Sequence, residues 1–134
     1  MNLPQFTLPW PERALWPNVS KGAHWTRTHR ARSQQKARAS MEAMAAGLHL
    51  HKASIPADAL IGIHWTFCPT SRTSHYDDDN AEAAMKSARD QIAAVLGVDD
   101  RRFVATKERG DKCKDGGVIV NLRILESDNL RIAK

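Results

Sequence analysis

The sequence has no long apolar run and only two cysteines. No stretch approaches the roughly 20 apolar residues that a membrane-spanning helix needs. Residues 1–13 also lack the basic start, apolar core and small-residue cleavage site of a secretion signal. We therefore expect a cytoplasmic protein with no membrane partner.

Metal-type spacing of thiols and imidazoles is missing too. Cys68 and Cys113 stand alone, and His49 and His51 are two residues apart, which suits neither a helical pair nor a zinc pattern. In a reducing cytosol we expect the two thiols to be packing residues rather than a disulfide or a zinc site.

Length and charge bound the remaining possibilities. At 134 residues and 15.0 kDa, we expect the chain (1–134) to form one domain, with residues 127–134 as a loose tail. The net charge is +5, and residues 1–40 carry a balance of +6 against −1 for the remainder. A basic N-terminal third fits phosphate binding, although a solvated basic helix face explains it equally well.

The apolar patterning predicts a small α/β (α+β) domain with a mixed sheet of about four strands and two main helices, in the order β-α-β-α-β-β. Ile61, Ile63, Trp65 and Phe67 alternate onto one face of a strand. Gly47 is the expected stop of the first helix. The expected elements are strands 5–8, 60–68, 103–107 and 118–125, helices 28–46 and 80–96, and a loop over 17–25.

Two acidic clusters bracket the second predicted helix: Asp77, Asp78 and Asp79 precede it, and Asp99 and Asp100 follow it. Like charges cluster at an energetic cost unless a cation neutralises them. Mg²⁺ takes one or two carboxylates and completes its coordination with water and phosphate, which suits phosphodiester cleavage. Helix capping for the first cluster and a turn for the second explain the same residues without any function.

The helix between the clusters has two distinct faces. Asp79, Ala83, Lys86 and Asp90 share the face opposite its apolar stripe. Lys86 could orient a scissile phosphate from there, or it could pair with Asp90 or Glu82 for roughly a few tenths of a kcal/mol. The apolar stripe is formed by Ala84, Met85, Ala88, Ile92, Val95 and Leu96.

The length of this helix suggests a shared site. A straight helix over 80–96 would span roughly 25 Å, so Asp79 and Asp100 of one chain are expected near its opposite ends. Ligands of one metal ion must lie within a few ångströms of it. We therefore hypothesise that two chains share each site, with their helices packed antiparallel across a two-fold axis.

These motifs resemble those of the RusA-type Holliday junction resolvases of phages and prophages. Three stretches carry the resemblance, namely 77–80 (DDDN), 97–100 (GVDD) and 6–11 (FTLPWP), which is similar to the family's opening strand and proline-rich turn. The basic helix and the two closing strands also match, so the resemblance covers nearly the whole chain.

The resemblance implies an intertwined homodimer that binds four-way DNA junctions. It also implies symmetric, Mg²⁺-dependent nicks in DNA recombination and repair, with Mn²⁺ as an expected substitute. The metal-binding and catalytic carboxylates that it implies are Asp77, Asp79 and Asp100.

The chain departs from the family pattern at the lysine. The family's lysine lies four residues after the second aspartate, where this chain has Ala83, so we assign its catalytic role to Lys86. Asp78 and Asp99 remain alternative ligands. The residues that we expect to contact DNA phosphates are Lys21, Arg27, Arg30, Arg32, Lys36 and Arg38.

Three functions fit these observations to different degrees. The first is a crossover junction endodeoxyribonuclease. The second is a non-catalytic nucleic-acid-binding phage accessory protein, whose aspartates are only caps and turns. The third is a magnesium-dependent nucleotide phosphohydrolase, which the basic arm disfavours because a small substrate does not require it.

Overall fold

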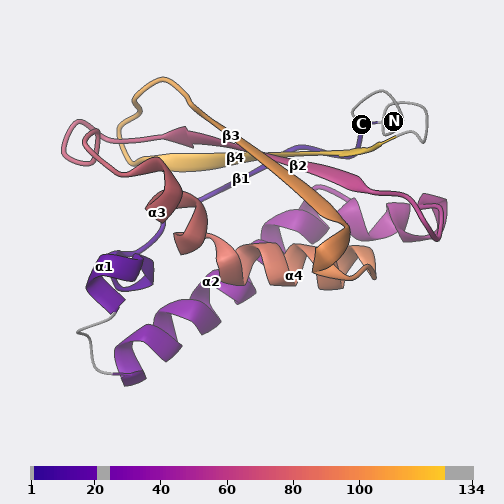
Figure 1. The fold of residues 1–134 in the computed structure, drawn as a ribbon, viewed down its shortest axis with the longest axis horizontal. Coiled ribbons are helices and arrows are strands. Elements are labelled where there is room, and N and C mark those ends of the chain that lie inside the picture. Colours follow the sequence, from indigo (N-terminus) through magenta and orange to yellow (C-terminus); the bar gives the residue numbers. More distant parts are fainter. Residues whose placement is uncertain (1, 21–24, 126–134) are drawn as a thin grey trace.

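The computed structural model describes residues 2–20 and 25–125. Its main elements follow the expected order, with short helical turns between them (Figure 1). The strands are β1 (Phe6–Leu8), β2 (Ile61–Cys68), β3 (Phe103–Arg109) and β4 (Gly117–Ile124). The α-helices are α1 (Pro17–Ser20), α2 (Trp25–Ala45), α3 (Asp78–Ala84) and α4 (Lys86–Leu96), and the 3-10 helices are η1 (Arg13–Leu15), η2 (Leu48–Ser54) and η3 (Asp100–Arg102).

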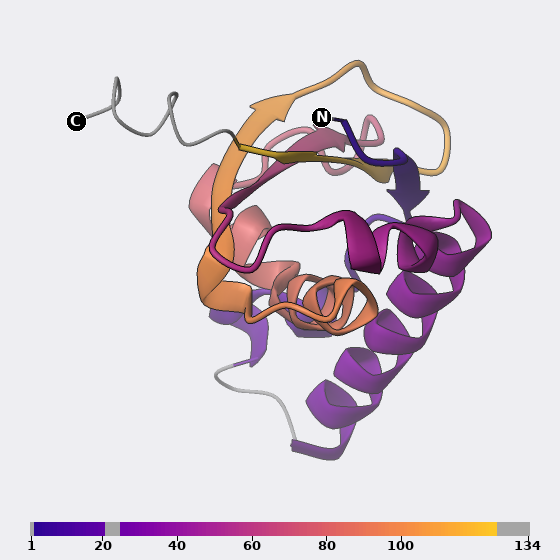
Figure 2. The same cartoon turned by 90° about the vertical axis from the view of Figure 1, so that its right-hand side faces the viewer.

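The strands form one mixed sheet in the order β1-β4-β2-β3. Strand β4 pairs antiparallel with both β1 and β2, whereas β2 and β3 are parallel. A parallel pair needs a long crossover connection, and α3 and α4 supply it. The main helices lie on one side of the sheet (Figures 1 and 2). The predicted α+β fold is confirmed.

Alternation along β2 decides which side chains face the helices. Ile61, Ile63, Trp65 and Phe67 are almost fully buried, as predicted, while the residues between them are only partly buried. Burial of each large apolar side chain stabilises the fold by about 1.5–3 kcal/mol. The helices contribute the predicted apolar stripe, whose members are all buried: Ala84, Met85, Ala88, Ile92, Val95 and Leu96.

Helix α2 confirms the first predicted helix, although it begins at Trp25 rather than at residue 28. It ends before Gly47, whose φ of 85° is the left-handed conformation that commonly follows a helix. The loop expected over 17–25 is wrong in its first part, because Pro17–Ser20 form the single turn α1. Proline favours the first position of a helix, since its φ is already helical there.

Both cysteines are free thiols. Cys68 is half-buried, and burial raises the pKa of its thiol by disfavouring the thiolate. Cys113 is exposed. The expectation that both are packing residues is therefore wrong for Cys113.

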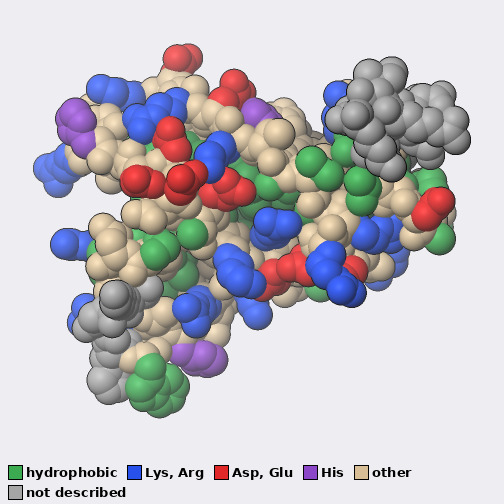
Figure 3. All heavy atoms as spheres, viewed as in Figure 1, with side chains coloured by type: hydrophobic (Ala, Val, Ile, Leu, Met, Phe, Trp, Pro, Cys, Tyr) green, Lys and Arg blue, Asp and Glu red, His purple; other side chains and the backbone are tan. Residues whose placement is uncertain are grey.

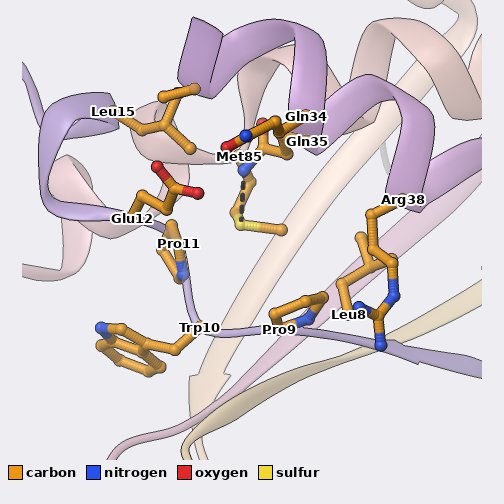
Figure 4. Close-up of a pocket in the computed structure, with 11 residues that line it drawn as sticks. Leu8, Pro9, Trp10, Pro11, Glu12, Leu15, Gln34, Gln35, Arg38 and Met85 are labelled. Carbon is orange, nitrogen blue, oxygen red and sulfur yellow. Dashed lines mark hydrogen bonds between the residues drawn. The ribbon is translucent and has the colours of Figure 1, made fainter. Parts of the chain in front are cut away.

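The second predicted helix is wrong as a single element, because it divides at Met85 into α3 and α4. Met85 leaves helical geometry, with φ −97° and ψ 8°. The side chain of Gln35 on α2 fills the gap: its Nε2 donates to the Ala84 carbonyl at 3.0 Å, and its Oε1 accepts from the Ala88 N–H at 3.0 Å. An unbroken α-helix would join those two backbone groups directly. Gln35, which also lies 3.5 Å from the Met85 sulfur (Figure 4), thus replaces the missing helical bond.

Candidate active site

The first acidic cluster opens α3. Asp77 has an extended backbone (φ −84°, ψ 127°), and its carboxylate accepts the Asn80 N–H at 3.0 Å, so Asp77 is the N-cap. Asp78 and Asp79 occupy the first turn, where the helix dipole favours negative charge. The Asp77 side is a hollow with aromatic walls formed by Trp10, Trp16 and Tyr76.

The second acidic cluster follows the end of α4. Gly97, with φ 70°, closes that helix. Asp99 then caps η3, because its carboxylate accepts the Arg101 N–H at 2.9 Å and the Arg101 guanidinium at 3.0 Å. These bonds lower the pKa of Asp99 to about 2. Asp100 comes next, and its backbone carbonyl accepts a hydrogen bond from Arg89 at 3.4 Å.

A single hollow brings the two clusters together within one chain. We call it the acid-lined hollow, and it is lined by Trp65, Asp79, Glu82, Ala83, Lys86, Arg89, Asp90 and Asp100. The predicted common face of Asp79, Ala83, Lys86 and Asp90 is therefore confirmed despite the break at Met85. In Figure 3, acidic side chains gather over α3, with basic side chains beside them over α4 and α2.

The length argument for a site shared between chains rested on a straight helix, and that premise is wrong. Because the helix divides at Met85, Asp79 and Asp100 of the same chain line one hollow. Asp77 does not line it, since its carboxylate is bonded to the backbone of its own helix. Within residues 2–20 and 25–125, no three His, Cys, Asp or Glu side chains are grouped closely enough to hold a metal ion together.

Lys107 on β3 is the site residue that the sequence reasoning missed. Its ammonium donates to Asp79 Oδ1 at 2.8 Å and to Glu82 Oε2 at 2.7 Å. These bonds raise the pKa of Lys107 and lower the pKa of Asp79. The parallel register pairs Lys107 with Trp65, and paired residues point to the same face of a sheet. The alternation of the predicted strand was therefore the signal for Lys107.

Arg109 on the same strand holds Asp78. Its Nε donates to Asp78 Oδ1 at 3.0 Å, and its other nitrogens donate to the carbonyls of Ser74 at 3.2 Å and Tyr76 at 2.9 Å. The guanidinium also lies 4.2 Å from the centre of the Tyr76 ring, a cation–π distance. Asp78 is thereby tied to the strand and does not line the acid-lined hollow.

Lys86 lies at the exposed rim of the acid-lined hollow. Its side chain is 76% exposed, and its ammonium is 3.5 Å from Asp90. The other predicted partner, Glu82, pairs with Lys107 instead. An exposed ion pair of this kind contributes little to stability, so Lys86 can exchange Asp90 for another anion at low cost.

The predicted phosphate contacts of α2 separate into two groups. Arg32 and Lys36 line a second hollow, between α2 and the break, together with Lys86 of α4. Arg27 and Arg30 are exposed on the same helix but do not line that hollow.

The remaining predicted contacts lie elsewhere. Arg38 pairs with Glu42 at 3.1 Å and lines a different pocket, beside Pro9 and Leu15 (Figure 4). Lys21 lies outside the described residues. Only part of the predicted basic set is therefore placed near the acidic clusters.

The fold and the hollow together define a small α+β domain with its acidic residues beside a parallel pair of strands. No protein-family model matches the chain. Over 114 residues it is 39% identical to a protein of Xylella fastidiosa (strain Temecula1 / ATCC 700964) that is described as uncharacterized, and the match covers 85% of this chain and 71% of that protein. The chain belongs to the same family as the Xylella protein. None of the helices in the described ranges combines the length and the apolar character that a bilayer crossing requires.

Proposed function

We propose that the chain is a Mg²⁺-dependent, structure-selective endodeoxyribonuclease that resolves Holliday junctions in DNA recombination and repair. The observation that carries this proposal is the gathering of Asp79, Glu82, Asp90 and Asp100 around one hollow of a protein with a net charge of +5. Carboxylates collected in this way repel DNA unless a cation lies between them and the phosphate.

The donor set of the acid-lined hollow suits Mg²⁺. Its oxygen ligands are hard, and Mg²⁺ needs only one or two carboxylates beside water and phosphate. Trp65 Nε1 and Arg89 Nε are buried without a hydrogen-bond partner among the described residues, and both residues line the hollow. A buried donor without an acceptor is unusual in a native fold, and an oxygen-bearing ligand in the hollow would supply the acceptor.

Asp79 and Asp100 are the residues that would hold the ion. Bound there, Mg²⁺ would polarise a phosphoryl oxygen and lower the pKa of a coordinated water. Asp77 is the third ligand that the RusA resemblance implies, and it would have to leave its N-cap bond to Asn80 in order to join them. We therefore assign Asp77 a smaller contribution than the other two.

Two lysines of the chain act on the phosphate and on the carboxylates. Lys86 presents an exposed ammonium at the rim of the hollow, where it can orient a phosphate and stabilise the charge that develops on it. Lys107 keeps Asp79 and Glu82 together from the sheet side. We further propose a homodimer, because a two-fold dimer presents two equivalent sites to a roughly two-fold junction.

The test is cleavage of a synthetic four-way junction. The wild-type protein should nick it with Mg²⁺ or Mn²⁺ and should stop in EDTA. Asp79→Asn and Asp100→Asn should each abolish cleavage, while junction binding in EDTA is kept or tightened because repulsion with phosphate is relieved. Asp58→Asn, an exposed site away from the hollow, is the matched control. Cleavage that survives both substitutions would refute the assignment.

A non-catalytic nucleic-acid-binding protein is the second candidate. Asp77 and Asp99 are ordinary caps, and Asp79 is already paired with Lys107, so each of these carboxylates has a structural partner. Such a protein would bind the junction equally well in Mg²⁺ and in EDTA and would never cut it. The same assay therefore separates the two candidates.

A further inference from the structure

The second hollow, which we call the α2–α4 hollow, adjoins the acid-lined hollow. Ala83, Lys86 and Asp90 line both of them. On the far side, α2 contributes Arg32 and Lys36. A basic depression therefore runs directly into the acidic one, and Lys86 stands at their junction.

The charges of the α2–α4 hollow favour an anion. Arg32, Lys36 and Lys86 supply three positive charges, and the acid that lines the hollow with them is Asp90. Asp90 is itself 3.5 Å from Lys86, so its charge is already offset. The hydroxyl-bearing residues Ser33 and Ser87 also line the hollow, and hydroxyls bind phosphate oxygens well.

The spacing of the cations suits a repeating anion rather than a single small one. Arg32 and Lys36 are four residues apart on α2, which places their Cα atoms about 6 Å apart along the helix axis. A nucleic-acid strand carries one charge for roughly each 3.4 Å of its axis. Both side chains are exposed, so neither is tied to the protein core.

We propose that the α2–α4 hollow seats the phosphates of the DNA strand next to the phosphate that enters the acid-lined hollow. This inference rests on the proposed function, because it takes DNA as the partner and the acid-lined hollow as the place of cleavage. The strand passes over Arg32 and Lys36, reaches Lys86, and enters the hollow lined by Asp79 and Asp100. Contacts of this kind position a strand without reading its bases, so recognition here is independent of sequence.

The experiment compares two double variants of the same helix. Arg32→Gln/Lys36→Gln removes two charges from the α2–α4 hollow, and Arg27→Gln/Arg30→Gln removes two exposed charges of the same helix outside it. Affinity for a labelled four-way junction is measured in EDTA over a range of salt concentrations. Each lost phosphate contact lowers the slope of log K against log salt by about 0.9, so the first variant should lower it by about two.

The control should change the slope much less, and both variants should melt like the wild type because all four side chains are exposed. Lys86→Gln should lower the slope by about one. Equal slopes for the two double variants, or an unchanged slope for Arg32→Gln/Lys36→Gln, would overturn the proposal. Since these measurements need no metal, they are separate from the cleavage assay: loss of cleavage in Asp79→Asn with an unchanged slope here would keep the nuclease and remove this strand path.

Discussion

Lys107 and Asp79 are 28 residues apart in sequence, and the ammonium of one donates to the carboxylate of the other at 2.8 Å. The same ammonium donates to Glu82 at 2.7 Å. Lys107 thus already supplies a positive charge to two of the carboxylates that line the acid-lined hollow. In the metal-dependent function that we propose, a divalent cation that binds Asp79 must compete with Lys107 for its oxygen.

Replacement of Lys107 with Met should raise the pKa of Asp79 toward the ordinary value of about 3.9, because the hydrogen bond that lowers it is lost. The folded-state pKa of Asp79 lies below its unfolded value, so the pair stabilises the fold above about pH 4. That contribution is lost as the pH falls through the lowered pKa. Titration of the carboxylate carbons by NMR measures the shift directly.

Lys114→Met is the control for that titration, since Lys114 is exposed in the turn before β4. It should leave the pKa of Asp79 unchanged. If the Lys107 variant also left it unchanged, the pairing seen between β3 and α3 would not exist in solution. Magnesium titration of the same variant, followed by thermal melting, should show tighter binding than in the wild type.

Replacement of Gln35 with Leu should destabilise the fold by about 1–3 kcal/mol, the usual effect of leaving buried backbone groups without partners. The Ala84 carbonyl and the Ala88 N–H would both lose the side chain that now bridges them. Urea unfolding measures the change. Gln34→Leu, an exposed neighbour, should stay within about 0.5 kcal/mol of the wild type. Equal stability of the two variants would contradict the role of Gln35.

Mixed dimers of an Asp79→Asn chain and an Asp100→Asn chain should show no recovery of cleavage. Each chain lines its own hollow with both carboxylates, so every hollow in the mixed dimer would lack one of them. Recovery of part of the wild-type activity would instead require a hollow completed by the second chain. Co-purification through two different affinity tags yields the mixed species for the assay.

Local patterns in the sequence were enough to predict most of the fold. The alternation of Ile61, Ile63, Trp65 and Phe67 depends only on neighbours two residues apart, and β2 confirms it. Gly47 ends α2 for an equally local reason. The shared face of Asp79 and Asp90 also follows from helical periodicity, and it survives the break because α3 and α4 continue in nearly the same register.

The features that could not be predicted depend on contacts that are remote in sequence. The break at Met85 involves Gln35, which lies 50 residues away on another helix. The partner of Asp79 is on β3, and it is reached only through the parallel pairing of that strand with β2. Neither contact leaves a periodic trace in the chain. The roles of Asp77, Asp79 and Asp100 as metal ligands stay predictions.

The amide of Gln35 gives the two halves of the surface a common mechanical element. It is carried by α2, the helix of Arg32 and Lys36, yet it is bonded to the last carbonyl of α3 and to an early N–H of α4. A strand that pulls on α2 therefore pulls on the joint between the two acidic helices as well. Gripping the backbone and adjusting the spacing of the carboxylates are, through this one side chain, a single displacement.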